Sequence, residues 1–247
     1  MFKDGFYDTY SSTHLQHRKP KPTLESFRAK APTWHRTFDD LLPPDRHSRI
    51  LDIGCGSGNL VWWLQSVGYE TAEGIDTSAE LVSIAQDLGV PNIRQARMEE
   101  HLRGHVDQYD VIILRDVLEH FPPEEVVDIL CQCRDALRPL GRVVLQVPNA
   151  DSPTFGHVRY GDFTHELAFT AVSLTQLFNR IGLPDVQFRS SPPPLRGRRA
   201  IGRRALWAVV ERFYQLLLYA ELGPGQRIVT QNILAVAVKR ADVGREP

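Results

Sequence analysis

The stretch Leu51-Asp52-Ile53-Gly54-Cys55-Gly56-Ser57-Gly58-Asn59-Leu60 decides the fold of this chain. It contains an apolar strand, a glycine-rich turn and the first residues of a helix. Its three glycines allow the backbone to turn tightly and to approach a ligand without clashes from Cβ atoms. The helix that follows directs free N–H groups and the positive end of its dipole toward that ligand. The stretch therefore predicts a site for a nucleotide-type cofactor.

The glycine spacing is G-x-G-x-G, which differs from the G-x-G-x-x-G of dinucleotide-binding proteins. Asp52 lies two residues before the first glycine, and its carboxylate would repel a pyrophosphate but attract an ammonium or a sulfonium group. The pattern resembles motif I of the class I S-adenosylmethionine (SAM)-dependent methyltransferases. This resemblance implies that SAM is the cofactor. Its amino acid end would be held by Asp52 and by the turn residues Gly54, Cys55 and Gly56.

The length and the composition of the chain limit the classes of protein to which it can belong. The 247 residues suffice for one large α/β domain with a small addition, and the formal net charge of −1 argues against a nucleic-acid partner. Three cysteines cannot build a disulfide framework, and the N-terminus lacks the apolar segment of a signal peptide. We therefore expect a cytoplasmic protein. No run of about 18 uncharged apolar residues predicts a membrane span.

Strand and helix patterns alternate from Arg49 onward, which is typical of a parallel sheet with right-handed crossovers. Strands are predicted at 50–53, 71–75, 92–96, 111–114, 143–147, 186–188 and 228–238, and helices at 60–67, 79–88, 124–137 and 174–181, with a turn at 137–142. The expected fold class is α/β. It is a Rossmann-like, seven-stranded, mostly parallel sheet flanked by helices, and its antiparallel final strand resembles that of the methyltransferase sheet.

Two segments lie outside this repeating pattern. Residues 1–47, polar and rich in proline, are predicted as an N-terminal helical lid or arm on a methyltransferase domain at 48–247. An insertion at about 189–225 precedes the last strand, with an arginine-rich stretch followed by an apolar, aromatic helix at 205–222. That helix could pack on the sheet or on a second subunit in a homodimer. It could also rest with 195–222 on an anionic membrane surface, or form a basic patch for a polyanionic substrate.

An acid ends the second predicted strand. Asp76 lies at the carboxyl edge of the sheet, where it could accept both hydroxyl groups of a ribose, although Asp76, Thr77 and Ser78 are all good helix caps. The methyltransferase resemblance implies four further contacts with the cofactor. Thr77 is expected to contact the cofactor, Met98 would lie beside the adenine, and Leu114 and Arg115 would lie beside the methionine part.

A group of acids and histidines is expected at the same edge. Asp116, Glu119 and His120 follow the fourth strand at positions i, i+3 and i+4, which share one face of a helical turn. His165 lies in the loop after the fifth strand, and both loops face one cleft. The pattern resembles a metal site in small-RNA 3′-end 2′-O-methyltransferases and ubiquinone-pathway O-methyltransferases. It implies Mg²⁺ or another divalent cation, which would activate a hydroxyl group. Without metal, His165 or His120 would act as the general base.

The acceptor is inferred from a looser resemblance. Residues 159–174 and 7–14 resemble methyltransferases encoded with bacterial glycan-assembly enzymes. This favours a hydroxyl group of a sugar or glycan, which could be linked to a lipid, in which case the protein would lie at the membrane periphery. One alternative is a small-molecule O-methyltransferase acting on a catechol or quinone precursor. Another is a SAM-binding partner protein without catalysis. RNA methylation is disfavoured, because phosphate binding needs an excess of basic residues.

Overall fold

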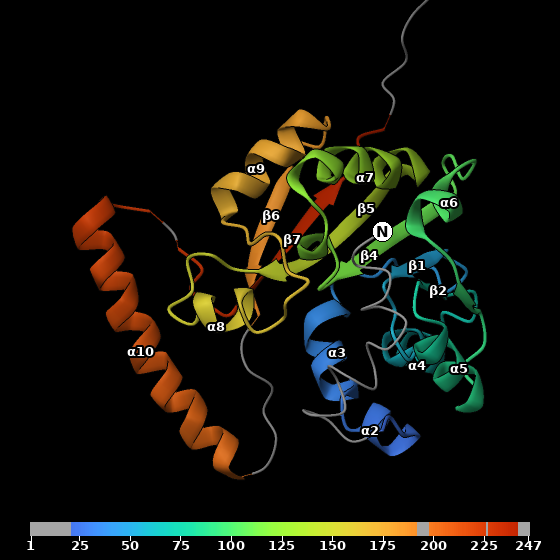
Figure 1. The fold of residues 1–247 in the computed structure, drawn as a ribbon, viewed down its shortest axis with the longest axis horizontal. Helices are drawn as coiled ribbons and strands as arrows, with labels where there is room; N and C mark the ends of the chain where they lie inside the picture. The colour runs from blue at the N-terminus through green and yellow to red at the C-terminus, as the bar shows by residue number, and fades with distance from the viewer. Residues whose placement is uncertain (1–20, 192–197, 226, 242–247) are drawn as a thin grey trace, which may run out of the picture.

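Seven strands form one sheet in the order β3-β2-β1-β4-β5-β7-β6 in the computed structural model, which describes residues 21–191, 198–225 and 227–241 (Figure 1). The strands are β1 (Ile50–Ile53), β2 (Glu73–Asp76), β3 (Ile93–Gln95), β4 (Tyr109–Arg115), β5 (Leu137–Pro148), β6 (Val186–Ser190) and β7 (Asn232–Val238). Strands β1 to β5 run parallel, and β7 is antiparallel to both β5 and β6. This arrangement confirms the predicted α/β class and the antiparallel final strand.

Helices cover both faces of the sheet (Figure 1). They are α2 (Leu24–Arg28), α3 (Ala31–Phe38), α4 (Asn59–Ser66), α5 (Ala79–Asp87), α6 (Met98–Leu102), α7 (Pro123–Ala136), α8 (Phe155–Arg159), α9 (Ala171–Arg180) and α10 (Arg198–Leu222), with a 3₁₀ helix η2 (Leu118–His120) after β4. In Figure 1, α3, α4 and α5 lie on one side of the sheet and α7 and α9 on the other.

The central strand β4 shows why the sheet is covered on both faces. Val111 and Ile113 pack into a cluster with side chains of α3 and α4, whereas Ile112 and Leu114 pack into a cluster with side chains of α7 and α9. All four side chains are fully buried. Successive side chains of a strand point to opposite faces, and each such burial stabilises the fold by about 1.5–3 kcal/mol. The continuous apolar run therefore holds two helical layers together.

The N-terminal helices pack into the body of the domain. Trp34 and Phe38 of α3 lie in the core cluster formed with α4. The indole Nε1 of Trp34 donates a hydrogen bond of 2.7 Å to Oδ1 of Asn59, the first residue of α4. Within the predicted arm 1–47, this part is therefore anchored on the sheet. Residues 1–20 of that arm lie outside the described residues.

Strand β5 is longer than the sequence predicts. It begins at Leu137 rather than at residue 143, and Leu137 pairs with Tyr109 of β4. The next pair joins Arg142 to Val111, so the residues between Leu137 and Arg142 protrude as a bulge. The turn predicted at 137–142 is therefore enclosed within the strand.

The predicted start of the last strand was wrong. Strand β7 begins at Asn232 rather than at residue 228. The side-chain amide of Asn149 donates hydrogen bonds to the carbonyl oxygens of Ile228 at 2.7 Å and Thr230 at 2.9 Å. Since those carbonyls are engaged by a side chain, the segment joins the loop after β5 instead of pairing in the sheet.

The predicted helical insertion is present and longer than expected. Helix α10 begins at Arg198 rather than at residue 205 and ends at Leu222 as predicted. It stands apart from the strands, beyond the β7–β6 edge of the sheet (Figure 1). In the part of the chain that the structure describes, none of the helices has the length and apolar character needed to cross a membrane.

Candidate functional site

The glycine turn between β1 and α4 is fastened to β2. Gly54 and Cys55 both donate their backbone N–H to the carbonyl oxygen of Ile75, at 2.8 and 3.0 Å. The φ angles of Gly54, Gly56 and Gly58 are 70°, 56° and 77°, the left-handed region that favours glycine. A Cβ atom at Gly56 would meet no atom within 4 Å. The turn therefore leaves open space at the position where the sequence predicts the cofactor.

Asp52 supplies a buried carboxyl group beside the turn. Its side chain is 1% exposed, and Oδ1 has no hydrogen-bond partner among the described residues. Burial raises the pKa of Asp52 to about 7, although the positive charge of Arg115 opposes this shift. A buried charge is costly unless it meets an opposite one. The orphaned oxygen therefore fits the ammonium group of SAM.

Asp76 ends β2 with its carboxylate directed to the same turn. Oδ2 accepts a hydrogen bond from Gly56 N and Oδ1 accepts one from Ser78 N, both at 2.8 Å. Burial raises the pKa of Asp76, and these backbone donors oppose that shift. Ser78, not Asp76, caps α5 by accepting a hydrogen bond from Leu81 N. The carboxylate therefore remains a candidate for the ribose hydroxyl groups, and Thr77 lies exposed beside it.

The remaining predicted cofactor residues occupy the ends of β3 and β4. Met98 follows β3 at the start of α6, with its side chain in the hydrophobic core. Leu114 is fully buried in β4. Arg115 ends that strand, and its guanidinium carbon lies 4.3 Å from the ring centre of Trp34. Helix α3 thereby stacks on the charged residue that faces the buried Asp52.

Glu119, His120 and His165 come together although two different loops carry them. Each offers a ligand atom, and the three atoms lie within 4.8 Å of one another. Backbone hydrogen bonds fasten the loops, because Glu166 N and Leu167 N donate to the carbonyl oxygen of Glu119 at 2.7 and 3.2 Å. The carboxyl oxygen Oε2 of Glu119 is buried without a hydrogen-bond partner among the described residues. Burial, reinforced by the nearby charge of Asp116, raises the pKa of Glu119.

Oxygen acceptors orient both histidine rings. Nδ1 of His120 lies 2.9 Å from Oγ1 of Thr164, whose hydroxyl group donates to Oδ1 of Asp162 at 2.7 Å. Because that hydroxyl proton is used, His120 must be the donor at Nδ1. Nδ1 of His165 lies 3.0 Å from the carbonyl oxygen of Val158, so it also donates. In the neutral rings, Nε2 is therefore the lone-pair nitrogen, and such outer partners are typical of metal-binding histidines.

Asp116 does not join this group as predicted. Its φ of 55° places it in the left-handed region, and η2 begins only at Leu118, so no helical turn aligns it with Glu119. Its carboxylate accepts hydrogen bonds from Gln146 of β5 at 3.1 Å and Asn232 of β7 at 3.0 Å. The expected four-residue set is thus reduced to three. Asp116 acts as a neighbouring charge and links the end of β4 to β5 and to β7, the next strand but one.

A cavity of about 360 Å³ opens beside His165. It is lined by Arg159, Tyr160, Asp162, Phe163, Thr164, His165 and Glu166. The aromatic side chains of Tyr160 and Phe163 are 77% and 78% exposed, unusually high values for large rings. Burial lowers the pKa of His165, while Asp162 opposes this shift. A neutral imidazole and exposed aromatic surface thus face one hollow.

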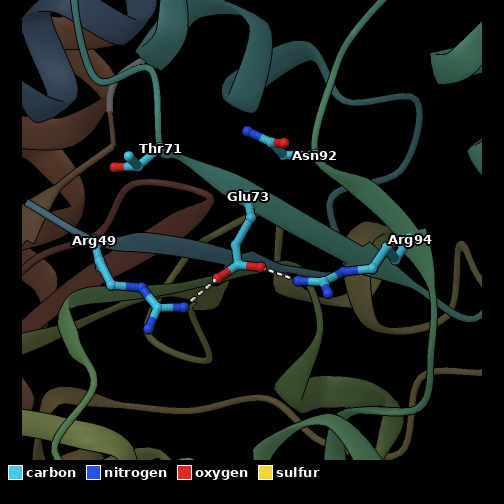
Figure 2. A pocket seen from close by; sticks show the side chains of 5 residues that line it. All are labelled: Arg49, Thr71, Glu73, Asn92 and Arg94. Atoms are coloured by element: carbon cyan, nitrogen blue, oxygen red, sulfur yellow. Dashed lines mark hydrogen bonds and ion pairs between the residues drawn. The ribbon is translucent and has the colours of Figure 1, made fainter. Parts of the chain in front are cut away.

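A second hollow, of about 420 Å³, lies at the amino ends of the strands, opposite the glycine turn. Figure 2 shows the carboxylate of Glu73 between the guanidinium groups of Arg49 and Arg94. Tyr109 donates its hydroxyl group to the same carboxylate at 3.1 Å. In parallel α/β sheets, ligands bind at the carboxyl ends of the strands. This hollow is therefore a structural ion network.

Sequence reasoning assigned no role to Thr164, Asp162 or Trp34. Thr164 N also donates to Oδ1 of Asp162 at 2.9 Å, a turn that the spacing Asp-x-Thr favours. The Asp-x-Thr turn can be predicted from the sequence. The hydrogen bond between Thr164 and His120 cannot, because 44 residues separate them in the chain. The stacking of Trp34 on Arg115 is equally remote in sequence.

Comparison with known proteins agrees with this geometry. A family profile described as a methyltransferase domain matches residues 25–187. The chain is 34% identical over 107 residues to a ubiquinone biosynthesis O-methyltransferase of Klebsiella pneumoniae. This matched segment covers 41% of this chain and 43% of that protein. The chain therefore spans less than half the length of the curated relatives it matches.

Two solved structures show the same fold. A SAM-dependent methyltransferase from Archaeoglobus fulgidus superposes with a TM-score of 0.63 and 19% identity, over 87% of this chain and 97% of that chain. One from Mesorhizobium loti superposes with a TM-score of 0.58 and 16% identity, over 84% and 98%. At these identities the likeness extends to the architecture alone.

Proposed function

This chain belongs to the SAM-dependent methyltransferase family, and on that premise we propose that it transfers a methyl group to a hydroxyl oxygen of a small molecule. The curated relatives that it matches include ubiquinone biosynthesis O-methyltransferases, which supports oxygen as the acceptor atom. The sequence analysis favoured a sugar or glycan, whereas these relatives support its alternative, a small-molecule acceptor.

The residues around the glycine turn fit the cofactor. The unpartnered Oδ1 of Asp52 would receive the ammonium group, and the carboxylate of Asp76 would receive the ribose hydroxyl groups. When bound, SAM supplies a methyl group on a sulfonium, which a nucleophilic oxygen can displace. The protein's task is then to exclude water and to hold the acceptor oxygen in line with that methyl group.

The group of Glu119, His120 and His165 carries the proposal for the acceptor side. Glu119 is 1% exposed and lacks a hydrogen-bond partner at Oε2 among the described residues, so a cation at this position would relieve an uncompensated buried group. The two imidazoles are already oriented through Nδ1. Two nitrogens and one carboxylate oxygen suit a transition-metal ion such as Zn²⁺ or Mn²⁺ better than Mg²⁺.

The cation would act on the acceptor hydroxyl. When bound, it would lower the pKa of that hydroxyl and hold a neighbouring oxygen of the acceptor. A small molecule with two adjacent oxygens, such as a catechol, offers this chelating pair. The exposed rings of Tyr160 and Phe163 at the cavity supply apolar surface for an aromatic acceptor.

Elemental analysis combined with turnover tests this proposal. We expect about one equivalent of a divalent transition metal in the purified protein and loss of catechol methylation after chelation. Glu119→Gln and His165→Ala should lose both metal and turnover. His157→Ala is the matched control, because His157 is exposed on neighbouring α8 and lies outside the group.

The opposite result has a definite meaning. A protein that contains no metal and methylates a catechol at the same rate with chelator would overturn the cation. His165, whose pKa is lowered by burial, would then remain as a neutral general base. Turnover with sugars but not with catechols would overturn the small-molecule acceptor and restore the glycan.

A further inference from the structure

We propose that α10 is a membrane-surface helix that docks the protein on anionic phospholipid. This surface is separate from the cofactor and acceptor sites, so the proposal does not rest on the proposed function. It is carried by the exposure of one face of α10 and by the charge of the segment that contains it.

One face of α10 exposes an unbroken apolar stripe. It is formed by Leu206, Val209, Val210, Phe213, Leu216 and Leu217, which are between 38% and 67% exposed. Their spacing of three and four residues places them along one side of the helix. At a rise of about 1.5 Å per residue, the stripe is roughly 16 Å long. Soluble surfaces rarely present such a continuous apolar face without a partner.

The other side of α10 is less exposed. Trp207, Tyr214 and Leu218 are only partly exposed, and they recur at the i, i+7 and i+11 positions of one helical side. Gln215 donates from its side-chain amide to the carbonyl oxygen of Arg227 at 3.2 Å. This hydrogen bond joins the less exposed side of α10 to the segment before β7, and the apolar stripe lies on the other side of the helix.

The sequence that contains the stripe is rich in arginine. Residues 196–222 contain six arginines and two glutamates, whereas the whole chain has a formal net charge of −1. Arg203 and Arg212 are exposed and flank the stripe on its two sides. Arginine side chains can bury their methylene stems beside lipid and keep the guanidinium group at the headgroups. An apolar face bordered by arginine is the pattern of a helix that lies in the plane of an anionic membrane.

The same charge disfavours a second copy of the chain as the occupant. A two-fold interface places the same patch of each subunit against the other. Two α10 segments would then bring two strongly basic stretches together, with only Glu211 and Glu221 of each segment to offset them. An anionic lipid surface instead supplies the complementary charge. We therefore commit to lipid and treat self-association as an outcome of the test.

Vesicle co-sedimentation of the full chain tests the proposal. The protein should bind vesicles of phosphatidylcholine with phosphatidylglycerol at least about tenfold more tightly than vesicles of phosphatidylcholine alone, and added salt should weaken binding. The double variant Leu206→Glu, Phe213→Glu should lose binding to both kinds of vesicle. Arg203→Glu with Arg204→Glu should remove the preference for the anionic vesicles.

Two controls keep these outcomes interpretable. Val172→Glu alters a side chain of α9 that is 68% exposed, and it should bind vesicles like the unchanged protein. Each variant should retain SAM affinity, which shows that it is folded. Failure of the unchanged protein to bind anionic vesicles overturns the proposal. So does a concentration-dependent dimer that the Leu206 and Phe213 changes dissociate when no vesicle binding is seen.

Discussion

Asp52 and Asp76, carried by neighbouring strands, lie close enough at the carboxyl edge of the sheet for the charge of Asp76 to raise the pKa of Asp52. Burial is the larger cause of that shift, and Arg115 reduces it. Burial thus disfavours the charged form of both carboxyl groups. Such an arrangement favours a ligand that brings positive charge and hydroxyl donors together.

SAM affinity should fall at acidic pH. The pKa of Asp52 is about 7, so below this pH a proton competes with the ammonium group of SAM for the carboxylate. Affinity should then decrease by up to about tenfold per pH unit. Asp52→Asn should bind weakly at every pH and lose this dependence. Calorimetric titration would show the slope, and an equal slope in Asp52→Asn would assign the dependence to another group.

The stability of the cofactor-free protein should change in the opposite direction. The pKa of Asp52 is about 7 in the folded state, against 3.8 for a freely solvated aspartate, so the folded state holds the extra proton between these values. Its contribution is complete below about pH 4 and is lost as pH rises through about 7, a loss of up to about 4 kcal/mol. Asp52→Asn should therefore unfold at higher urea concentration than the unchanged protein at about pH 8. Equal midpoints would contradict this reading of the buried carboxyl.

Removing the hydroxyl group of Thr164 should impair catalysis without unfolding the protein. In Thr164→Val, Nδ1 of His120 loses the hydroxyl oxygen that accepts its hydrogen bond, so one constraint on the orientation of the ring is removed. We expect metal affinity and kcat to fall by about 10- to 100-fold, as for other outer partners of metal-binding histidines. Thr164→Ser should retain both. A fall in kcat that serine does not rescue would point to packing instead.

Gly54→Ala should destabilise the glycine turn. The new Cβ would lie 2.3 Å from Cγ2 of Val117, and φ at Gly54 is 70°. We expect a loss of about 2–4 kcal/mol, of which the left-handed backbone accounts for about 1–2 kcal/mol. Gly104→Ala is the control, because its φ is 85° and a Cβ there meets no atom within 4 Å. Denaturant unfolding would measure both variants. Adding Val117→Ala to Gly54→Ala should remove the clash, so that the loss of unfolding free energy falls to that of Gly104→Ala.

Glu73→Gln should affect stability and leave turnover unchanged. The Glu73 side chain is 9% exposed and faces both Arg49 and Arg94, so neutralising it leaves two guanidinium groups without their counter-ion. We expect a loss of about 1–2 kcal/mol, because the two guanidinium groups are 36% and 59% exposed and stay in contact with water. Arg94→Ala should cost less than about 1 kcal/mol, because that side chain is 59% exposed. A large fall in kcat in a folded Glu73→Gln protein would instead assign this hollow to the active site.

Local sequence patterns predicted the elements near the cofactor well. The predicted strand at 50–53 coincides with β1, and the predicted helix at 79–88 differs from α5 by one residue. Apolar runs and glycine turns act over a few residues, so they can be read directly. The convergence of His165 with Glu119 was also expected, since loops after neighbouring parallel strands meet at one edge.

Features that depend on distant partners were not predictable. Asp116 has a left-handed backbone, and its carboxylate accepts hydrogen bonds from Gln146 and Asn232. No local sequence pattern predicts those partners. The start of β7 depends on Asn149, which lies about 80 residues earlier in the chain. In each case, hydrogen bonds from side chains far away in the sequence override the local preference.

The hydrogen bonds from Gly54 and Cys55 to Ile75 are made entirely by backbone atoms of the chain. The backbone of the turn is therefore ordered when the domain folds, and the entropy of that ordering is lost during folding instead of during ligand capture. Cofactor association should consequently leave amide hydrogen exchange at the turn almost unchanged. The measured heat of binding should then report the contacts themselves, with little contribution from loop ordering.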